Sequence, residues 1–377
     1  MTDRRDPFDG AFSGRTVLVT GHTGFKGTWL CLWLQELGAR VVGFALAPPA
    51  QPNLFAQCGL GRRMDSRIGD VRERERLERT LADVRPEFVF HLAAQSLVRR
   101  SYREPVATFA TNVMGTVHLL EAVRRVDCVR ACVVVTSDKC YENLERGGLL
   151  REGDRLGGSE PYGASKAAAE LVVAAYRSAF LDASAGGPST SSVRAGNVLG
   201  GGDWSEDRIL PDCIRALRQG APIPVRNPSS VRPWQYVLEP LAGYLWLAAR
   251  QRVQPAAYAE AWNFGPDAGG CLPVGALVDR VIDLWGDPSA KAIHADESAS
   301  ESTTPEAGWL DLDSDKARRR LGWHPVLSID EVLERSVDWY RRSCQDSAFD
   351  ADRDCREEIA RYLATARERG LRWAGGA

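Results

Sequence analysis

Residues 20–27, Thr-Gly-His-Thr-Gly-Phe-Lys-Gly, decide the fold of this chain. They follow an apolar run at residues 15–19 and precede a helical pattern at residues 29–34. A strand, a glycine turn and a helix in this order form a phosphate cradle, because the turn exposes backbone N–H groups and the helix N-terminus favours negative charge. The glycines are spaced GxxGxxG rather than GxGxxG, and their position between strand and helix predicts a dinucleotide pyrophosphate site.

Strand-like and helix-like patterns alternate through the first half of the chain, which is typical of βαβ units. Further strands are expected at residues 41–46, 88–92, 131–135 and 192–195, long helices at 106–123 and 162–180, and a surface loop at 182–190. The pattern predicts an α/β fold with a Rossmann-type, doubly wound parallel sheet. Residues 14–195 form its dinucleotide-binding domain.

Beyond residue 196 glycines, tryptophans and prolines cluster, which indicates a smaller C-terminal α/β lobe over residues 196–345. Helices are expected at residues 209–219, 238–251 and 274–285, and an exposed connection at 287–305. Segments near residues 234–265 are expected to return to the first domain. Residues 346–377 are predicted to form an Arg/Glu-rich helical tail to which no chemistry is assigned.

Composition excludes several classes of protein. The 377 residues are 44% hydrophobic and carry a formal net charge of -2, so no basic surface for nucleic acid is expected. We find no signal-peptide core and no run of 18 apolar residues, so no membrane partner is expected. Nine cysteines lack zinc-ligand spacing, which predicts no metal site and a reducing compartment. The sequence therefore predicts a soluble, cytoplasmic protein.

The choice between NAD and NADP depends on the end of the second strand. Residues 43–47 offer no acid for a ribose hydroxyl and no arginine for a 2′-phosphate. NAD is favoured because no positive charge is nearby, while Arg62 and Arg63 keep NADP open. Asp70 and Val71 follow another expected strand, where Asp70 either meets the adenine or caps the next helix.

Tyr162 and Lys166 lie four residues apart, on one face of a predicted helix start. A lysine ammonium beside a phenol, reinforced by a nicotinamide cation, is expected to lower the tyrosine pKa and make it a base for alcohol oxidation. Ser137 follows the strand at 131–135 and is placed to contact the same substrate oxygen. A surface Tyr and Lys is the alternative for this spacing alone.

With residues 91–95, His-Leu-Ala-Ala-Gln, these motifs resemble the extended short-chain dehydrogenase/reductases that act on nucleotide sugars. The resemblance covers residues 14–343. Within that family, segments 21–27, 136–143, 194–204 and 232–240 are most similar to 4,6-dehydratases, which are lyases. The resemblance also implies a homodimer, or a dimer of dimers, formed through the two long helices.

The resemblance assigns site residues to three groups. The catalytic group is Ser137, Asp138, Lys139, Tyr162 and Lys166. The cofactor group is Gly21, Thr23, Gly24, Phe25, Lys26, Gly27, Asp70, Val71, Leu92, Ala93, Ala94, Asn112, Tyr162 and Lys166. The substrate group is Gln95, Ser96, Asn197, Trp204, Arg208, Arg232 and Gln235. Arg194 is a further candidate donor for a diphosphate, and Trp204 and Trp234 are either core residues or base-stacking platforms.

The roles implied by the resemblance follow from water loss across C5 and C6 of a hexose. Tyr162 takes the C4 hydroxyl proton while hydride moves to NAD, Asp138 protonates the leaving C6 hydroxyl, and the hydride returns to C6. Other 4,6-dehydratases carry Glu where this chain has Lys139, so the C5 base stays open: Lys139 acts itself, or it stabilises an enolate while another base or water accepts the proton. A 4-epimerase of the same fold is the alternative, and it needs no acid at C6.

Overall fold

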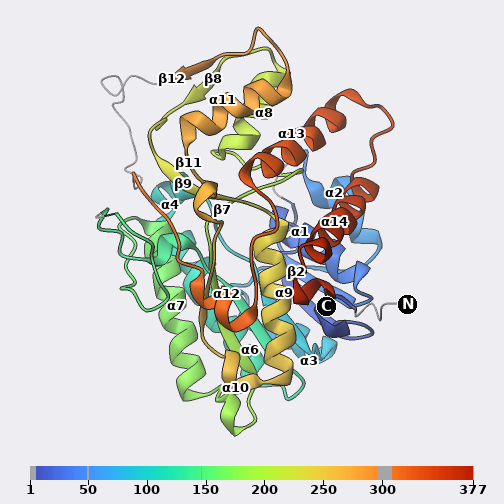
Figure 1. Ribbon diagram of the computed structural model, residues 1–377. Helices are drawn as coiled ribbons and strands as arrows, with labels where there is room; N and C mark the ends of the chain where they lie inside the picture. The colour runs from blue at the N-terminus through green and yellow to red at the C-terminus, as the bar shows by residue number, and fades with distance from the viewer. Residues whose placement is uncertain (1–5, 49–50, 146, 295–307, 377) are drawn as a thin grey trace.

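The computed structural model describes residues 6–48, 51–145, 147–294 and 308–376. Within them a parallel sheet of seven strands forms the centre of the molecule (Figure 1). Its strands are β1 (Thr16–Thr20), β2 (Arg40–Ala45), β3 (Asp65–Ile68), β4 (Phe88–His91), β5 (Ala131–Val135), β6 (Ser189–Ala195) and β10 (Ala261–Phe264). They are ordered β10-β6-β5-β4-β1-β2-β3, which confirms the predicted Rossmann fold.

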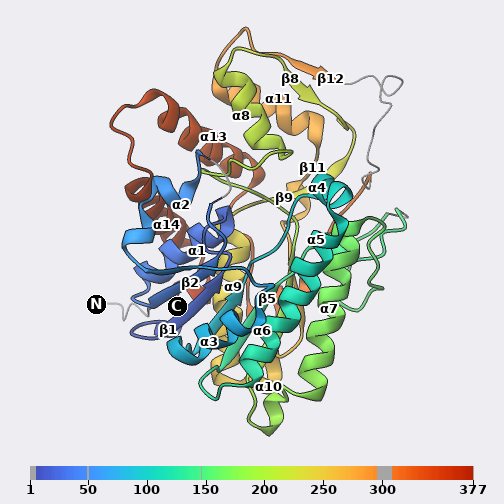
Figure 2. The ribbon, with the colours of Figure 1, turned by 180° about the vertical axis from the view of Figure 1, so that it is seen from behind.

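Helices cover both faces of this sheet (Figures 1 and 2). The residues of β1 alternate between two cores, with Val17 and Val19 in one and Leu18 in the other. The first core is shared with α1 (Phe25–Glu36), α9 (Leu238–Val253) and α14 (Ala351–Glu368), and the second with α3 (Arg74–Val84), α6 (Gly115–Arg124) and α7 (Pro161–Ala179). Both faces are therefore apolar, as buried parallel sheets require.

The long helix predicted at residues 106–123 runs as three joined pieces. These are α5 (Pro105–Phe109), a π-helical turn (Ala110–Met114) and α6. Among the described residues, the helix Pro105–Arg124 alone is long and apolar enough to cross a membrane, and core helices of soluble proteins pass the same test. The loop predicted at residues 182–190 is too long, because β6 begins at Ser189 and pairs with β5.

The second lobe lies beyond the carboxyl ends of the sheet strands (Figure 1). It contains β7 (Asn197–Leu199), β9 (Val231–Tyr236) and β11 (Cys271–Pro273) in one sheet and β8 (Ile223–Val225) with β12 (Ala292–His294) in another. Its helices are α8 (Ile209–Arg218), α11 (Val274–Trp285) and α13 (Ile329–Gln345). The expected connection at 287–305 lies mostly outside the described residues.

Shorter elements complete the chain. The short α-helices are α2 (Leu54–Gln57), α4 (Val98–Arg103), α10 (Pro255–Tyr258) and α12 (Asp315–Leu321). Single 3₁₀ turns occur at Pro7–Gly10, Leu60–Arg62, Asp138–Cys140, Ala183–Ala185, Ala268–Gly270 and Arg372–Ala374.

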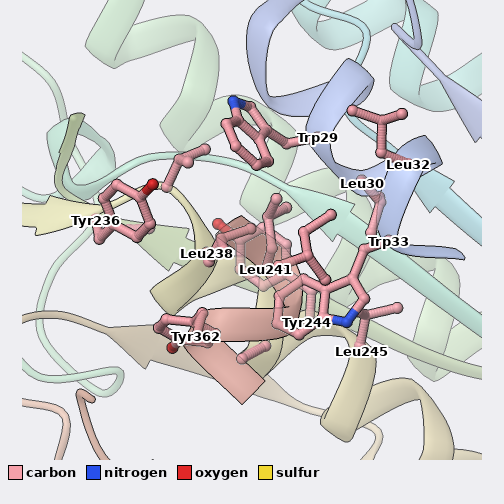
Figure 3. Packing of buried hydrophobic residues seen from close by; sticks show 14 of the residues in the cluster. Trp29, Leu30, Leu32, Trp33, Tyr236, Leu238, Leu241, Tyr244, Leu245 and Tyr362 are labelled. Atoms are coloured by element: carbon pink, nitrogen blue, oxygen red, sulfur yellow. The ribbon is translucent and has the colours of Figure 1, made fainter. Parts of the chain in front are cut away.

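The C-terminal segment packs on the Rossmann domain. Figure 3 shows Trp33 of α1, Tyr244 of α9 and Tyr362 of α14 in one aromatic core. Trp373 is also buried there, and its ring stacks on Phe8 with 5.4 Å between ring centroids. The helical tail predicted from sequence is thus part of the core that supports α1, the helix after the glycine turn.

Candidate active site

The glycine turn joins β1 to α1 and touches the loop that follows β4. Gly21 has φ +76°, and a Cβ there would lie 2.6 Å from the Ala93 nitrogen. A Cβ on Gly27 would lie 2.1 Å from the Gly21 oxygen, and Gly24 is the N-cap of α1. The backbone therefore forms a close-fitting cradle at the helix N-terminus, in the position where a doubly wound sheet binds a pyrophosphate.

Other predicted cofactor residues surround this turn with mixed outcomes. The Thr23 hydroxyl donates to the Leu46 oxygen at 2.8 Å, which fixes the turn against the end of β2. The Asp70 carboxylate accepts from the Arg72 backbone N–H at 2.9 Å and from its guanidinium at 2.8 Å. That ion pair lowers the pKa of Asp70. Asp70 thus orders its own turn and does not cap α3, whose N-cap is Glu73.

Arg63, one of the two arginines that could have bound the 2′-phosphate of NADP, bonds to other parts of the protein. The Arg63 guanidinium donates to Asp352 of α14 at 2.7 Å and to the Cys58 oxygen at 2.5 Å. It therefore connects the C-terminal helix to the segment before β3. Arg62 is exposed at the surface.

Asn112 lies in the π-helical turn and is buried. Its side chain accepts from the Gln95 N–H and donates to the Gln95 oxygen, both at 2.9 Å, and donates to the Ser165 hydroxyl at 2.8 Å. Asn112 thus connects the loop after β4 with α7, one residue before Lys166. Solvent exposure, the alternative for a polar residue in this helix, does not apply.

The five predicted catalytic residues lie at the carboxyl end of β5 and the start of α7. The Ser137 hydroxyl donates to Asp138 at 2.9 Å and hydrogen-bonds to the Tyr162 phenol. Lys139 is the next residue in the 3₁₀ turn and is half-buried. The turn and the helix therefore bring one hydroxyl, one carboxyl and one phenol together.

The protein's own groups do not lower the pKa of Tyr162, and the depression expected with a nicotinamide cation beside it stays a prediction. Burial raises the pKa of Tyr162 to about 12, and its hydrogen bond with Ser137 opposes this only in part. The Lys166 ammonium donates to the Val135 oxygen at 3.1 Å, and burial lowers the pKa of Lys166 to about 8. Sequence spacing predicted the pair but carried no information about how deeply α7 buries it.

Asp138 is the carboxyl with the most unusual surroundings. Burial raises its pKa, while the charge of Lys139, the Ser137 bond and the charge of Arg232 lower it. Its second oxygen, Oδ2, is buried with no hydrogen-bond partner among the described residues, and it faces Gly196. An unpaired buried oxygen is costly, so this atom is suited to a proton or to a bound hydroxyl group.

The predicted substrate residues divide into two sets. Arg208 donates to the Ser96 hydroxyl at 3.4 Å, Arg232 is buried near Asp138, and Asn197 is half-buried on β7. These four side chains come from separate segments that meet beyond the sheet.

The second set is engaged within the protein. The Gln95 amide donates to Thr108 at 3.0 Å and to Leu97, and the Gln235 amide donates to the Phe264 oxygen at 3.0 Å. The Trp204 indole donates to Gln57 at 3.1 Å and packs on Tyr340. Trp234 is buried, so of the two readings it is a core residue.

Three features of the site were missed from sequence. The Lys26 ammonium donates to the phenol of Tyr244 on α9 at 3.2 Å, which adds a distant helix to the site. Glu160 caps α7 by accepting from the backbone N–H groups of Tyr162 and Gly163 at 2.6 and 2.7 Å. Proline is favoured at the first position of a helix, so Pro161 with an acidic residue directly before it could have predicted this cap from the sequence.

The third feature corrects the candidate role of Arg194. Its guanidinium is buried and donates to Glu170 of α7 at 2.7 Å. Arg194 therefore belongs to a buried ion pair and is not available to a diphosphate.

A Rossmann sheet with a glycine cradle, a strand-end serine and a Tyr-x-x-x-Lys helix defines a short-chain dehydrogenase/reductase of the extended type. The model of the GDP-mannose 4,6 dehydratase family matches residues 18–336, and the chain belongs to that family. It is 47% identical over 333 residues to the CDP-glucose 4,6-dehydratase of Salmonella typhimurium, covering 88% of this chain and 91% of that protein.

Solved structures share the fold. The dTDP-glucose 4,6-dehydratase of Streptomyces venezuelae, with NAD bound, is 25% identical with a TM-score of 0.71, over 88% of this chain and 99% of that one. The UDP-glucose 4-epimerase of Thermotoga maritima gives a TM-score of 0.75 at 23% identity, over 88% of this chain and all of that one. The second likeness concerns the fold alone.

Proposed function

We propose that this chain is a hydro-lyase that converts CDP-glucose to CDP-4-dehydro-6-deoxy-glucose with NAD as its cofactor. The observation that carries the proposal is the 47% identity, over nearly nine-tenths of the chain, to a CDP-glucose 4,6-dehydratase. Membership of a 4,6-dehydratase family supports the same reaction class.

The residues around the glycine turn fit NAD. Gly21 and Gly27 let the turn pack closely on neighbouring backbone, and the N-terminus of α1 offers its N–H groups to the phosphates. Residues 43–47 carry no cation for a 2′-phosphate, and Arg63 is paired with Asp352, which favours NAD over NADP. When bound, NAD supplies a hydride acceptor that is regenerated within each turnover, as the dehydration has no net redox change.

Tyr162 takes the proton from the C4 hydroxyl as that carbon loses hydride. Its pKa of about 12 is too high for a base near neutral pH even with the Ser137 interaction present, so a cationic Lys166 and the positive charge that bound NAD would bring are needed to stabilise the phenolate. Lys166 is held within the site by its bond to Val135. These three residues remove the C4 hydroxyl proton, and bound NAD would accept the hydride; the resulting C4 ketone acidifies the C5 proton.

Asp138 gives a proton to the C6 hydroxyl, which leaves as water. Burial raises the pKa of Asp138, so this carboxyl holds a proton more readily than an exposed one. Water or another base accepts the C5 proton, and Lys139 stabilises the charge that develops on the C4 oxygen as that proton leaves. Bound NAD in its reduced form would supply the hydride that C6 needs to complete the product.

The diphosphate of the substrate is bound by Arg208 and Arg232, with Ser96 and Asn197 beside them. Planar guanidinium groups bind phosphate oxygens in pairs; Arg208 lies beside Ser96, and the charge of Arg232 acts on Asp138. We place the enzyme in the cytoplasm, where nucleotide sugars and reduced thiols occur together.

We further propose a homodimer formed by the face of α5, the π turn and α7. Val106 is 82% exposed, Leu171 61% and Met114 46%, although all three are apolar. Such a contiguous apolar surface is characteristic of an interface, and a second copy of the chain is the partner that fits it. Replacing Val106 with Glu should convert the dimer to monomer in sedimentation equilibrium, whereas Val253→Glu, at another exposed apolar site, should not.

The reaction is tested by offering the purified protein CDP-glucose, dTDP-glucose and GDP-mannose separately. A 4-keto-6-deoxy sugar is detected by its alkali-induced absorbance. Product from CDP-glucose at the highest kcat/KM supports the proposal. Product from another nucleotide sugar in its place overturns the nucleotide assignment, and epimerisation at C4 without water loss overturns the dehydratase.

A further inference from the structure

We propose that the buried pair Glu170 and Arg194 positions the catalytic turn by holding the residues on either side of it. Thr136 precedes the turn at residues 137–140 and Tyr141 follows it. We call Glu170, Arg194, Thr136 and Tyr141 the clamp. The inference rests on the proposed function for its kinetic test and on the geometry alone for a second test. None of these four residues belongs to the proposed substrate site, so they are positioning residues.

Glu170 holds the first side of the turn. Its carboxylate accepts from the Thr136 hydroxyl at 2.5 Å, from the Ser192 hydroxyl at 2.6 Å and from the Arg194 guanidinium at 2.7 Å. Glu170 is on α7, one helical turn beyond Lys166, and all of these groups are buried. The helix that carries Tyr162 and Lys166 is thereby bonded to the residue before Ser137.

Arg194 holds the second side. Its guanidinium donates to the Tyr141 oxygen at 2.7 Å and lies over the Tyr141 ring at 4.8 Å from the centroid. The Tyr141 hydroxyl in turn donates to Asn263 of β10 at 2.7 Å. The residue after the catalytic turn is thus fixed to two neighbouring strands, β6 and β10, and cannot shift independently of the sheet.

A stability role alone explains this arrangement poorly. Removing two charges from water costs free energy, and the attraction between the buried charges offsets that cost only approximately. Buried ion pairs therefore contribute little net stability. They do enforce one geometry, because any displacement leaves a charge unpaired. Here the enforced geometry is the spacing between α7, with Tyr162 and Lys166, and the turn with Ser137 and Asp138, and a misplacement of about 1 Å in such a site costs about 10²-fold in rate.

Two variants loosen the clamp without breaking the ion pair. Thr136→Val removes the hydroxyl that bonds to Glu170, and Tyr141→Phe removes the oxygen that bonds to Arg194. We expect each to lower kcat about tenfold while KM for CDP-glucose changes less than about twofold. Thr190→Val is the matched control, because Thr190 is a buried strand residue on β6 outside the clamp, and it should keep wild-type kcat.

Hydrogen–deuterium exchange tests the same inference without substrate. The backbone amides of residues 138–141 should exchange about tenfold faster in both clamp variants than in wild type and in Thr190→Val. Faster exchange supports the clamp even if the wild-type protein leaves CDP-glucose unchanged, an outcome that would remove only the proposed function. Wild-type exchange in both variants overturns the clamp, as does a loss of kcat that Thr190→Val shares.

Discussion

Asp138 and Glu239 are both buried carboxyls, and their two regions use burial differently. Glu239 lies at the junction between α9 and the C-terminal segment. Its oxygens accept from the N–H groups of Val326 and Leu327 at 2.8–2.9 Å and from the Tyr362 hydroxyl at 2.6 Å. Asp138 accepts from the Ser137 hydroxyl at 2.9 Å, and its Oδ2 has no hydrogen-bond partner among the described residues.

We infer from this difference that the buried Glu239 carboxyl stabilises the fold, whereas the buried Asp138 carboxyl serves the reaction. At the C-terminal junction every acceptor holds two elements together, so changes there should alter stability and leave the rate per folded molecule unchanged. At the catalytic turn the Oδ2 atom of Asp138 is left without a partner and is available to the substrate, which costs stability. Changes at this turn should therefore alter the rate and leave the stability of the protein unchanged or improved. Four experiments test this contrast.

Tyr162→Phe should give the largest effect. Loss of the base is expected to reduce kcat by about 10²–10⁴-fold, because proton removal from C4 loses its acceptor. The melting temperature should stay at the wild-type value. Tyr176→Phe serves as the control on the same helix, where the phenol donates to Glu121 at 3.0 Å far from the turn. A Tyr162→Phe enzyme with wild-type turnover would remove Tyr162 from the mechanism.

Trp373→Ala should destabilise the junction without changing the chemistry. The indole is buried between Phe8, Trp33 and Tyr362, and truncating such a side chain costs about 3–5 kcal/mol. Urea unfolding measures the loss, and turnover per folded molecule should match wild type below the transition. A selective fall in kcat at unchanged stability would contradict the proposed division.

Glu239 should make stability depend on pH. Burial raises the pKa of Glu239 from 4.5 to about 7, so the folded protein holds a proton that the unfolded chain releases between these values. Stability should therefore fall as pH rises from about 4.5 to about 7, by about 3 kcal/mol from this group. Glu239→Gln, which does not titrate, should flatten this part of the pH profile in thermal unfolding. An unchanged slope would mean that another group causes it.

Asp138→Asn should reduce turnover by about 100-fold and separate the two halves of the reaction. Oxidation at C4 should still occur, and water loss should stall, so the absorbance of reduced nicotinamide should build up on the enzyme. Unfolding free energy should stay level or rise by about 1 kcal/mol, because a costly buried carboxyl is removed. Full turnover without that build-up would exclude Asp138 as the acid.

Much of the sheet was predictable because β1, β2, β4 and β5 are short, largely apolar runs, whereas β3 is mostly polar; Gly21 and Gly27 lie where the backbone leaves no room for a Cβ. Local spacing likewise identified Tyr162 and Lys166. The pKa of Tyr162 was not predictable, because burial arises from elements far apart in sequence.

Arg194 shows the same limit. Its guanidinium suggested a phosphate ligand, yet its partners Glu170 and Tyr141 lie 24 and 53 residues away and only the fold brings them together. The packing of the C-terminal segment on α1 could not be predicted either, because an Arg/Glu-rich helix has the composition of an exposed helix and only the fold shows that its apolar residues contact α1.

The stacking of Phe8 on Trp373 has a consequence for synthesis. During synthesis Phe8 emerges from the ribosome long before Trp373, and the aromatic pocket against Trp33 lacks one wall until Trp373 follows. The cofactor-binding half therefore completes its fold only after residue 373 has emerged, and a truncation just before Trp373 should leave a protein prone to aggregation although every residue of the cradle and the catalytic turn is present.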